Sequence, residues 1–194
     1  MSEEVSRIRE VTCRLADALG EADYAIIGGV AVGYRSVLRT TRDVDAVLAV
    51  PRSSLPPILN RLQEAGFIVD VARVLKELRD DHLSHVQYAA TGTRLDLMDA
   101  LVPSYRQVVR LATWEEIEGH RIRIASAEGL IFLKLLAFRL QDRVDLRSLL
   151  AANRGKLKFD IIRDLYTQVG ETGDERWQHL ERVRAELDAA DREA

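Results

Sequence analysis

Three aspartates stand in valine- or leucine-rich stretches whose composition predicts β-strands. Asp43 and Asp45 are two residues apart in 43–50, and Asp96 lies at the centre of 94–98. Because side chains alternate along a strand, Asp43 and Asp45 share a face, where their charges repel unless water or a cation neutralises them. Magnesium binds hard oxygen ligands, typically one or two carboxylates plus substrate phosphates. If the two strands are neighbours, the pattern predicts a three-acid magnesium site.

A glycine pair precedes these acids. Gly28 and Gly29 follow the apolar run 24–27, which predicts a buried strand, and precede the helical turns expected over 30–36. Glycine lets the backbone approach a phosphate closely, and a helix N-terminus favours anions. A phosphate cradle beside a metal-binding acid pair is what phosphoryl or nucleotidyl transfer requires. Alone, the glycine pair is more typical of a simple turn, and the acid pair of a solvated surface.

Together, the order and spacing of these residues resemble the DNA polymerase beta type nucleotidyltransferase superfamily. Its signature is a hydrophobic residue and Gly-[Gly/Ser], a gap, Asp-hydrophobic-[Asp/Glu], and a later acid flanked by apolar residues. Here thirteen residues lie between Gly29 and Asp43, and Asp96 stands between two leucines. The resemblance covers 24–50 well and 93–98 by order and chemistry.

Within that superfamily the chain looks closest to the AbiEii and MenT-like toxin nucleotidyltransferases. One segment that carries this likeness is Arg39-x-Thr41-x-Asp43-x-Asp45, and the other is Lys134…Arg139-x-x-Asp142-x-x-Asp145. An unbroken helix would place Lys134, Asp142 and Asp145 on one side, and a break near Asp142 would change that geometry. Without the resemblance, Lys134 could extend to the surface, and the two acids could form ordinary surface ion pairs. The roles of Arg139 and Asp142 stay open.

The resemblance implies a role for each residue of the pattern. Asp43, Asp45 and Asp96 would be catalytic and hold Mg²⁺, in a two-metal site with Asp96 as the second metal ligand, the base, or both. Lys134 would neutralise the triphosphate. The nucleotide-binding set would be Gly28, Gly29, Arg39, Thr41, Lys134 and Asp145.

The implied reaction moves a nucleoside monophosphate from an NTP such as ATP to a hydroxyl acceptor, with pyrophosphate leaving. The acceptor would be tRNA or a protein, as for a toxin with a cognate antitoxin protein. One alternative is a small-molecule acceptor, as in aminoglycoside nucleotidyltransferases. Another is a nucleotide-binding or interaction module without turnover, which the complete acid set argues against.

The elements expected around these residues define a mixed α/β (α+β) fold. It is a nucleotidyltransferase-type mixed β-sheet core flanked by helices over 1–125, with a helical C-terminal part, 126–194, packing on it. Strands are expected over 24–27, 43–50, 67–71, 85–90 and 94–98, with a hairpin in 115–125. Helices are expected over 3–19, 30–36, 105–111, 127–140, 143–152, 158–169 and 173–190, and one more runs from a cap at Ser53 or Ser54 to a stop at Gly66. The stretch 74–80 is ambiguous.

Composition adds limits. The chain has 194 residues, is 47% hydrophobic and 30% charged, and carries a net charge of −3, so it does not resemble a basic nucleic-acid-binding domain. A single cysteine, Cys13, allows no internal disulfide. No apolar run is long enough to span a bilayer, and the start lacks a signal-peptide pattern. A cytoplasmic protein without a membrane partner is expected.

Overall fold

The computed structural model describes residues 3–37, 40–101 and 103–190. They fall into two compact units. Unit 1 holds the described parts of Met1–Ala31 and Arg39–Ala125, and unit 2 holds those of Val32–Leu38 and Ser126–Ala194. The helix α2 (Gly28–Arg35) begins in unit 1 and ends in unit 2. Whether 1–125 and 126–194 are separate domains stays a prediction.

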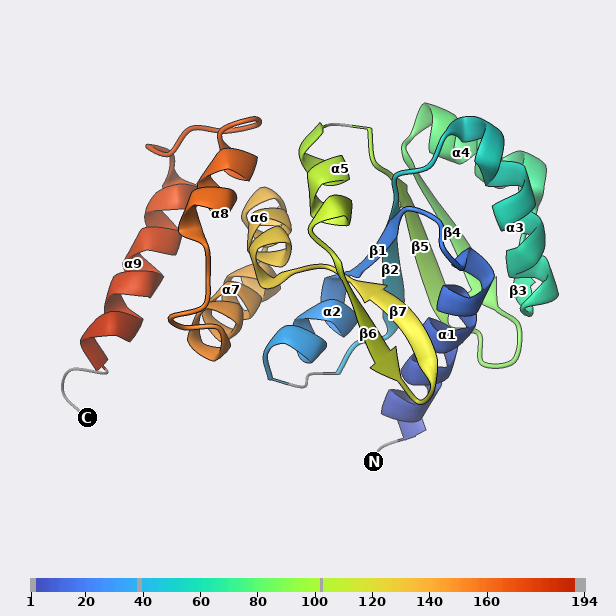
Figure 1. The fold of residues 1–194 in the computed structure, drawn as a ribbon, viewed down its shortest axis with the longest axis horizontal. Coiled ribbons are helices and arrows are strands. Elements are labelled where there is room, and N and C mark those ends of the chain that lie inside the picture. The colour runs from blue at the N-terminus through green and yellow to red at the C-terminus, as the bar shows by residue number, and fades with distance from the viewer. Residues whose placement is uncertain (1–2, 38–39, 102, 191–194) are drawn as a thin grey trace. The chain divides into compact units, whose positions relative to one another are not determined.

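Unit 1 is built on one seven-stranded mixed sheet (Figure 1). Its strands are β1 (Tyr24–Ile27), β2 (Asp43–Leu48), β3 (Phe67–Ile68), β4 (Leu83–Tyr88), β5 (Arg94–Asp99), β6 (Thr113–Ile117) and β7 (His120–Ile124). The spatial order is β3-β4-β5-β2-β1-β7-β6. β2 and β5 are parallel neighbours, while β1 pairs antiparallel with β2. The mixed sheet flanked by helices confirms the fold class expected from the sequence.

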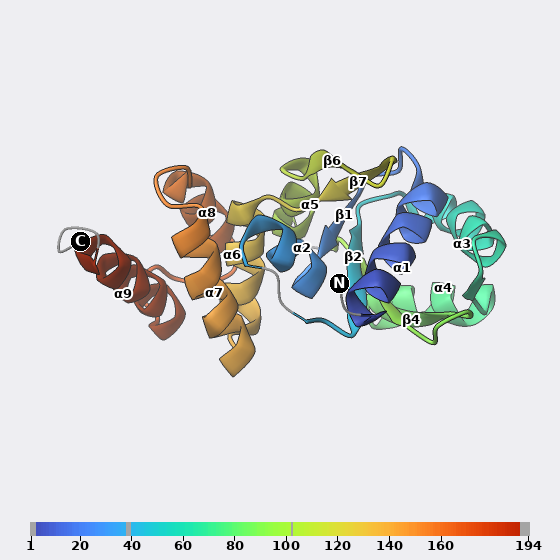
Figure 2. The same ribbon diagram turned by 90° about the horizontal axis from the view of Figure 1, so that it is seen from below.

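The remaining elements of unit 1 are mostly helical. They are α1 (Glu3–Leu19), the short 3₁₀ helix η1 (Arg52–Ser54), α3 (Leu55–Glu64), α4 (Val71–Asp80) and α5 (Pro103–Arg110). α1 packs on β2, β7 and α3, and α1 and α3 lie side by side in Figure 2. Burying apolar side chains such as Leu15, Leu59 and Leu97 drives this packing.

One face of β4, β5 and β2 carries a group of polar side chains. Tyr88 in β4 donates a hydrogen bond to Glu10 of α1, so the Tyr88 face points toward α1. His85, three residues earlier, is on the opposite face because side chains alternate along a strand. It pairs in register with Asp96, which in turn pairs with Asp45. The acids therefore extend from the sheet face opposite α1.

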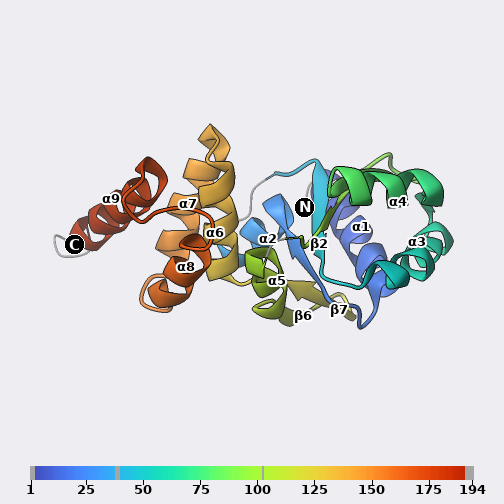
Figure 3. The same cartoon turned by 90° about the horizontal axis from the view of Figure 1, so that it is seen from above.

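Unit 2 is helical, with α6 (Ala127–Ala137), α7 (Leu140–Ala152), α8 (Phe159–Tyr166) and α9 (Glu175–Ala190). α6 packs against α7 and α8, as Figure 3 shows. Phe132, Leu146 and Leu165 are fully buried. Tyr166 stacks on Trp177 at a centroid distance of 5.5 Å. Because helices α6 to α8 bury apolar side chains, unit 2 has its own core.

Several element boundaries differ from expectation, and two of these differences have a clear local cause. Val71 starts α4 rather than ending a strand, because the Asp70 carboxylate accepts the Arg73 backbone N–H at 3.0 Å and caps the helix. α6 stops at Ala137, since Phe138 adopts a left-handed conformation with φ +49°. In the part of the chain described, no helix is long and apolar enough to cross a membrane.

Candidate active site

Gly28 follows β1 and opens α2 in a conformation that suits glycine. Its φ is +62°, in the left-handed region that L side chains rarely adopt. A Cβ atom at this position would lie 1.9 Å from Oδ2 of Asp45. Gly29 is buried behind it. The turn therefore brings bare backbone into contact with the second acid of the predicted pair.

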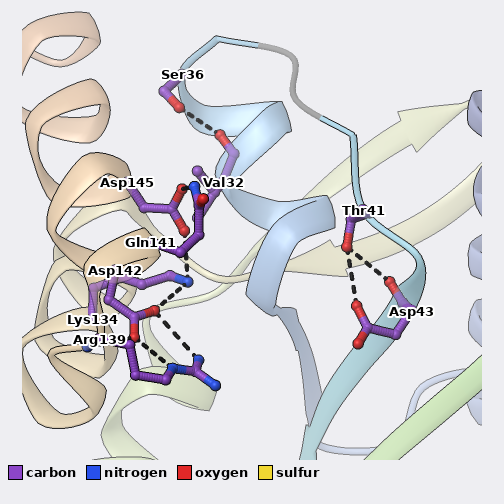
Figure 4. Close-up of polar contacts among 9 residues, drawn as sticks. All are labelled: Val32, Ser36, Thr41, Asp43, Lys134, Arg139, Gln141, Asp142 and Asp145. Atoms are coloured by element: carbon purple, nitrogen blue, oxygen red, sulfur yellow. Dashed lines mark hydrogen bonds and ion pairs between the residues drawn. The ribbon is translucent and has the colours of Figure 1, made fainter.

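Asp43 and Asp45 occupy the first and third positions of β2, and both are partly exposed while Val44 between them is buried. Thr41 donates a hydrogen bond from Oγ1 to Oδ1 of Asp43 at 3.0 Å (Figure 4). This contact orders the segment that enters β2. Of the nucleotide-binding set, Arg39 lies outside the described residues.

Asp96 is directly opposite Asp45 in the parallel pairing of β5 with β2. It is only 6% exposed. Paired strands run about 4.8 Å apart, so the two carboxylates extend from neighbouring positions of one face. The strand adjacency on which the predicted three-acid site depends is thus present in the structure.

Arg94 is a member of this cluster that the sequence reasoning did not single out. It donates from Nε to Oδ1 of Asp96 at 2.6 Å and from Nη2 to Oδ2 at 2.5 Å, a two-point ion pair. Arg94 also pairs in register with Asp43. The hydrogen-bonded Asp96, followed by the charges of Asp43 and Asp45, raises the pKa of Arg94. The available signal was the spacing Arg-x-Asp within a strand, which places both side chains on one face.

His85 completes the exposed rim of the cluster. Its Nδ1 lies 3.4 Å from Oδ1 of Asp96, and the ring is half-exposed. No cluster of three or more His, Cys, Asp or Glu side chains able to hold a metal occurs among the described residues. His85 therefore adds a polar side chain next to the third acid.

The chemistry of the acids fits magnesium better than it fits a preformed protein cage. Magnesium keeps several waters and takes one or two carboxylates together with substrate phosphates, so it needs no three-ligand protein cluster. Asp45 and Asp96 provide two carboxylates on adjacent strands, and the absence of a Cβ at Gly28 lets the Asp45 carboxylate lie against the backbone of the turn. The binding of the Arg94 guanidinium to Asp96 shows that the carboxylates attract positive charge.

The second predicted group of residues meets within unit 2. Nζ of Lys134 lies 2.9 Å from Oδ1 of Asp142 and 2.7 Å from Oδ2 of Asp145 (Figure 4). Lys134 is 7% exposed and each aspartate 1%. Lys134 therefore does not extend to solvent, and the two acids are not surface ion pairs. Gln141 donates a further hydrogen bond to Asp145 at 3.0 Å.

These residues meet although the helix between them is broken. Arg139 is the N-cap of α7, and its backbone N–H and its Nε donate to Oδ2 of Asp142 at 3.0 and 2.8 Å. Asp142 therefore caps α7 and binds Lys134 of α6 at once. Burial alone would raise the pKa of Asp142, but the hydrogen bonds from Arg139 and Lys134 outweigh it and leave the pKa below its ordinary value.

The comparisons with known proteins concern the fold. No protein-family model matches the chain, and no curated protein matches it significantly. Among solved structures, a candidate nucleotidyltransferase from H. pylori matches 98% of this chain and 99% of its own, with 17% identity and a TM-score of 0.53. JHP933 from Helicobacter pylori matches 100% and 97%, with 16% identity and a TM-score of 0.52.

The antibiotic-resistance factor ANT(2″)-Ia is a third match. It covers 96% of this chain and 94% of its own, with 17% identity and a TM-score of 0.50. Identities this low relate architectures rather than active sites. The chain has the mixed α/β fold of nucleotidyltransferase-like proteins.

Proposed function

We propose that this protein is a magnesium-dependent nucleotidyltransferase that moves a nucleoside monophosphate from an NTP to a hydroxyl acceptor. The observation that carries the proposal is the register of Asp45 opposite Asp96, with the Gly28 backbone against Asp45. On a nucleotidyltransferase-like fold, that arrangement would allow the turn to bind phosphate beside paired carboxylates. Fold alone would not support the activity, so the proposal rests on these residues.

Each residue takes a role that its position supports. Asp43 and Asp45 would hold the cation together with Asp96, and Thr41 keeps Asp43 in place through its hydrogen bond. The cation, when bound, neutralises the phosphate oxygens and polarises the α-phosphorus. The backbone N–H groups of Gly28 and Gly29 would bind phosphate oxygens at the start of α2.

The transfer step is a substitution at the α-phosphorus. The acceptor oxygen forms a bond to that phosphorus while the bond to the β-phosphate bridging oxygen breaks, and pyrophosphate leaves with the electron pair. Asp96 accepts the hydroxyl proton, which a carboxylate can do close to a metal even at a low pKa. Asp96 can do this only while its oxygens are not both held by Arg94.

The ion pairs of Lys134 with Asp142 and Asp145 favour a role in holding α6 and α7 together over direct neutralisation of a triphosphate. Two buried carboxylates already balance its ammonium charge. A phosphate contact would require those carboxylates to release it, leaving Asp142 and Asp145 unpaired in the interior, which is costly. Asp145 accordingly holds Lys134 in place, and the nucleotide-binding role stays the less supported alternative.

For the acceptor we favour tRNA or protein, as for a toxin controlled by a cognate antitoxin. This rests on the resemblance of the Arg39–Asp45 and Lys134–Asp145 segments to toxin nucleotidyltransferases. A small-molecule acceptor is the second candidate, favoured by the match of nearly the whole chain to the fold of ANT(2″)-Ia.

The test is transfer from each of the four α-labelled NTPs with magnesium. Acceptors would be total tRNA, lysate protein and a set of aminoglycosides, in separate reactions. We expect label in one acceptor class, lost in Asp43→Asn and Asp96→Asn. The matched control is Asp81→Asn, the same change at an exposed site on unit 1, which should transfer normally. Folded wild-type protein that labels no acceptor with any NTP would contradict the proposal and favour a module without turnover.

A further inference from the structure

The Arg94 guanidinium occupies both carboxylate oxygens of Asp96. Nε and Nη2 reach the two oxygens at 2.6 and 2.5 Å, the fork geometry in which arginine binds a carboxylate most strongly. Since Asp96 is 6% exposed, little of it is open to another ligand. A cation that binds Asp96 must therefore share or replace these contacts.

The negative charges around Arg94 explain why its guanidinium binds Asp96. Arg94 is paired in register with Asp43, and Asp96 with Asp45, so the guanidinium shares one sheet face with three carboxylates, and the charges of all three act on it. Three acids on adjacent strand positions repel one another unless a positive charge lies between them. Arg94 supplies that charge from within the chain.

Arginine cannot give up this charge by losing a proton, because a guanidinium stays protonated in proteins. It can only move. The Arg94 side chain is 52% exposed, whereas that of Asp96 is 9% exposed, so the arginine has solvent into which it can turn and the aspartate does not. The pair is thus built from one fixed partner and one movable partner.

We propose that Arg94 is a displaceable counter-cation, which competes with a divalent cation for Asp96 and thereby sets the metal affinity of the site. The inference rests on the proposed function, because it takes Asp43, Asp45 and Asp96 as the metal-binding acids. Binding of the cation exchanges the two guanidinium hydrogen bonds of Asp96 for metal coordination. Arg94 is a positioning residue in this scheme: it keeps Asp96 oriented and limits when Asp96 is available.

The test measures metal affinity rather than activity. Mn²⁺ would be titrated into the full-length chain, and free Mn²⁺ followed by electron paramagnetic resonance. We expect Arg94→Gln to bind Mn²⁺ about three- to tenfold more tightly than wild type, the range for a half-exposed charged hydrogen-bonded pair. Arg94→Lys keeps the charge but loses the fork, so its affinity should fall between the two, and it guards against misfolding of the glutamine variant.

A matched control separates direct competition from general charge. Arg42 is exposed and precedes Asp43, so Arg42→Gln removes the same charge close to the site without touching Asp96. Equal tightening by Arg42→Gln and Arg94→Gln would overturn the inference, as would unchanged affinity in both Arg94 variants.

Asp45→Asn distinguishes this failure from failure of the proposed function. If Asp45→Asn abolishes Mn²⁺ binding but Arg94→Gln does not strengthen it, only the role of Arg94 is wrong. If Asp45→Asn binds Mn²⁺ as wild type does, the acids are not the metal site and both proposals fail.

Discussion

A Cβ atom at Gly28 would lie 1.9 Å from Oδ2 of Asp45, closer than any real Cβ contact. The residue is also at φ +62°. Gly28 is therefore constrained twice, by its own backbone and by the acid across the pairing of β1 with β2.

We predict that Gly28→Ala disables the site. The added methyl group must push the Asp45 carboxylate away, and a displacement of about 1 Å in a catalytic group can cost on the order of a hundredfold in rate. Stability should fall by roughly 1–3 kcal/mol from strain. Nucleotidyl transfer and urea unfolding of the same preparation measure the two effects.

Gly20→Ala is the control for backbone strain. Gly20 has a similar φ of +55°, but nothing lies within 4 Å of a Cβ there. It should lose about 1 kcal/mol and keep full transfer. A Gly28→Ala protein that transfers as well as Gly20→Ala would show that the close approach to Asp45 has no functional part.

We predict that Lys134→Met destabilises unit 2 by about 3–5 kcal/mol, because it leaves Asp142 and Asp145 buried without their cation. Unfolding in urea would be followed by Trp177 fluorescence in a Trp114→Phe background, since these are the two tryptophans of the chain. Lys76→Met is the control, because Lys76 pairs with Asp80 at the surface and should lose under about 0.5 kcal/mol. A stable, folded Lys134→Met protein without transfer activity would instead favour contact with the nucleotide.

We predict a specific acid sensitivity of unit 2. The pKa of Asp142 is lower in the folded protein than its ordinary value of 3.8, so its ionised form stabilises the fold above that pH. That stabilisation is lost as the pH falls from about 4 through the folded-state pKa. Asp142→Asn should be less stable than wild type at pH 7 and show a smaller loss below pH 4. Trp177 unfolding curves between pH 2 and 7 would measure this, and parallel pH profiles would contradict it.

We predict that Cys13 is slow to react in the native protein. Burial, followed by the charges of Glu118 and Asp17, raises the pKa of its thiol, so less thiolate is present at any pH below that value. Alkylation by iodoacetamide at pH 8 should be at least about tenfold slower in native than in urea-unfolded protein. Equal rates would mean that α1 opens readily at this position.

Part of the site was readable from the sequence because its spacing is local. The strands expected over 85–90 and 94–98 correspond to β4 and β5, which pair antiparallel across a turn with Gly92 at φ +69°. The alternation that places Asp43 and Asp45 on one face follows from strand geometry.

The rest depended on contacts that no local pattern carries. The helix breaks at Phe138 although no Gly or Pro at this point predicts a break. The capping contacts between Arg139 and Asp142 stabilise it instead. Lys134 is buried because α6 packs against α7, and the sequence alone does not predict this, since the same sequence suits a surface lysine. The pairing of Arg94 with Asp96 required a rotamer choice that sequence does not specify.

The parallel pairing of β2 with β5 has a consequence for how the protein folds. β4 and β5 form a local hairpin, whereas β2 and β5 are separated in the sequence by a stretch that contains α3 and α4. Non-local parallel pairing is slow because loop closure precedes the contacts that reward it. Asp45 should therefore meet Asp96 late in folding, so that partly folded chains lack the paired acids until β2 has paired with β5.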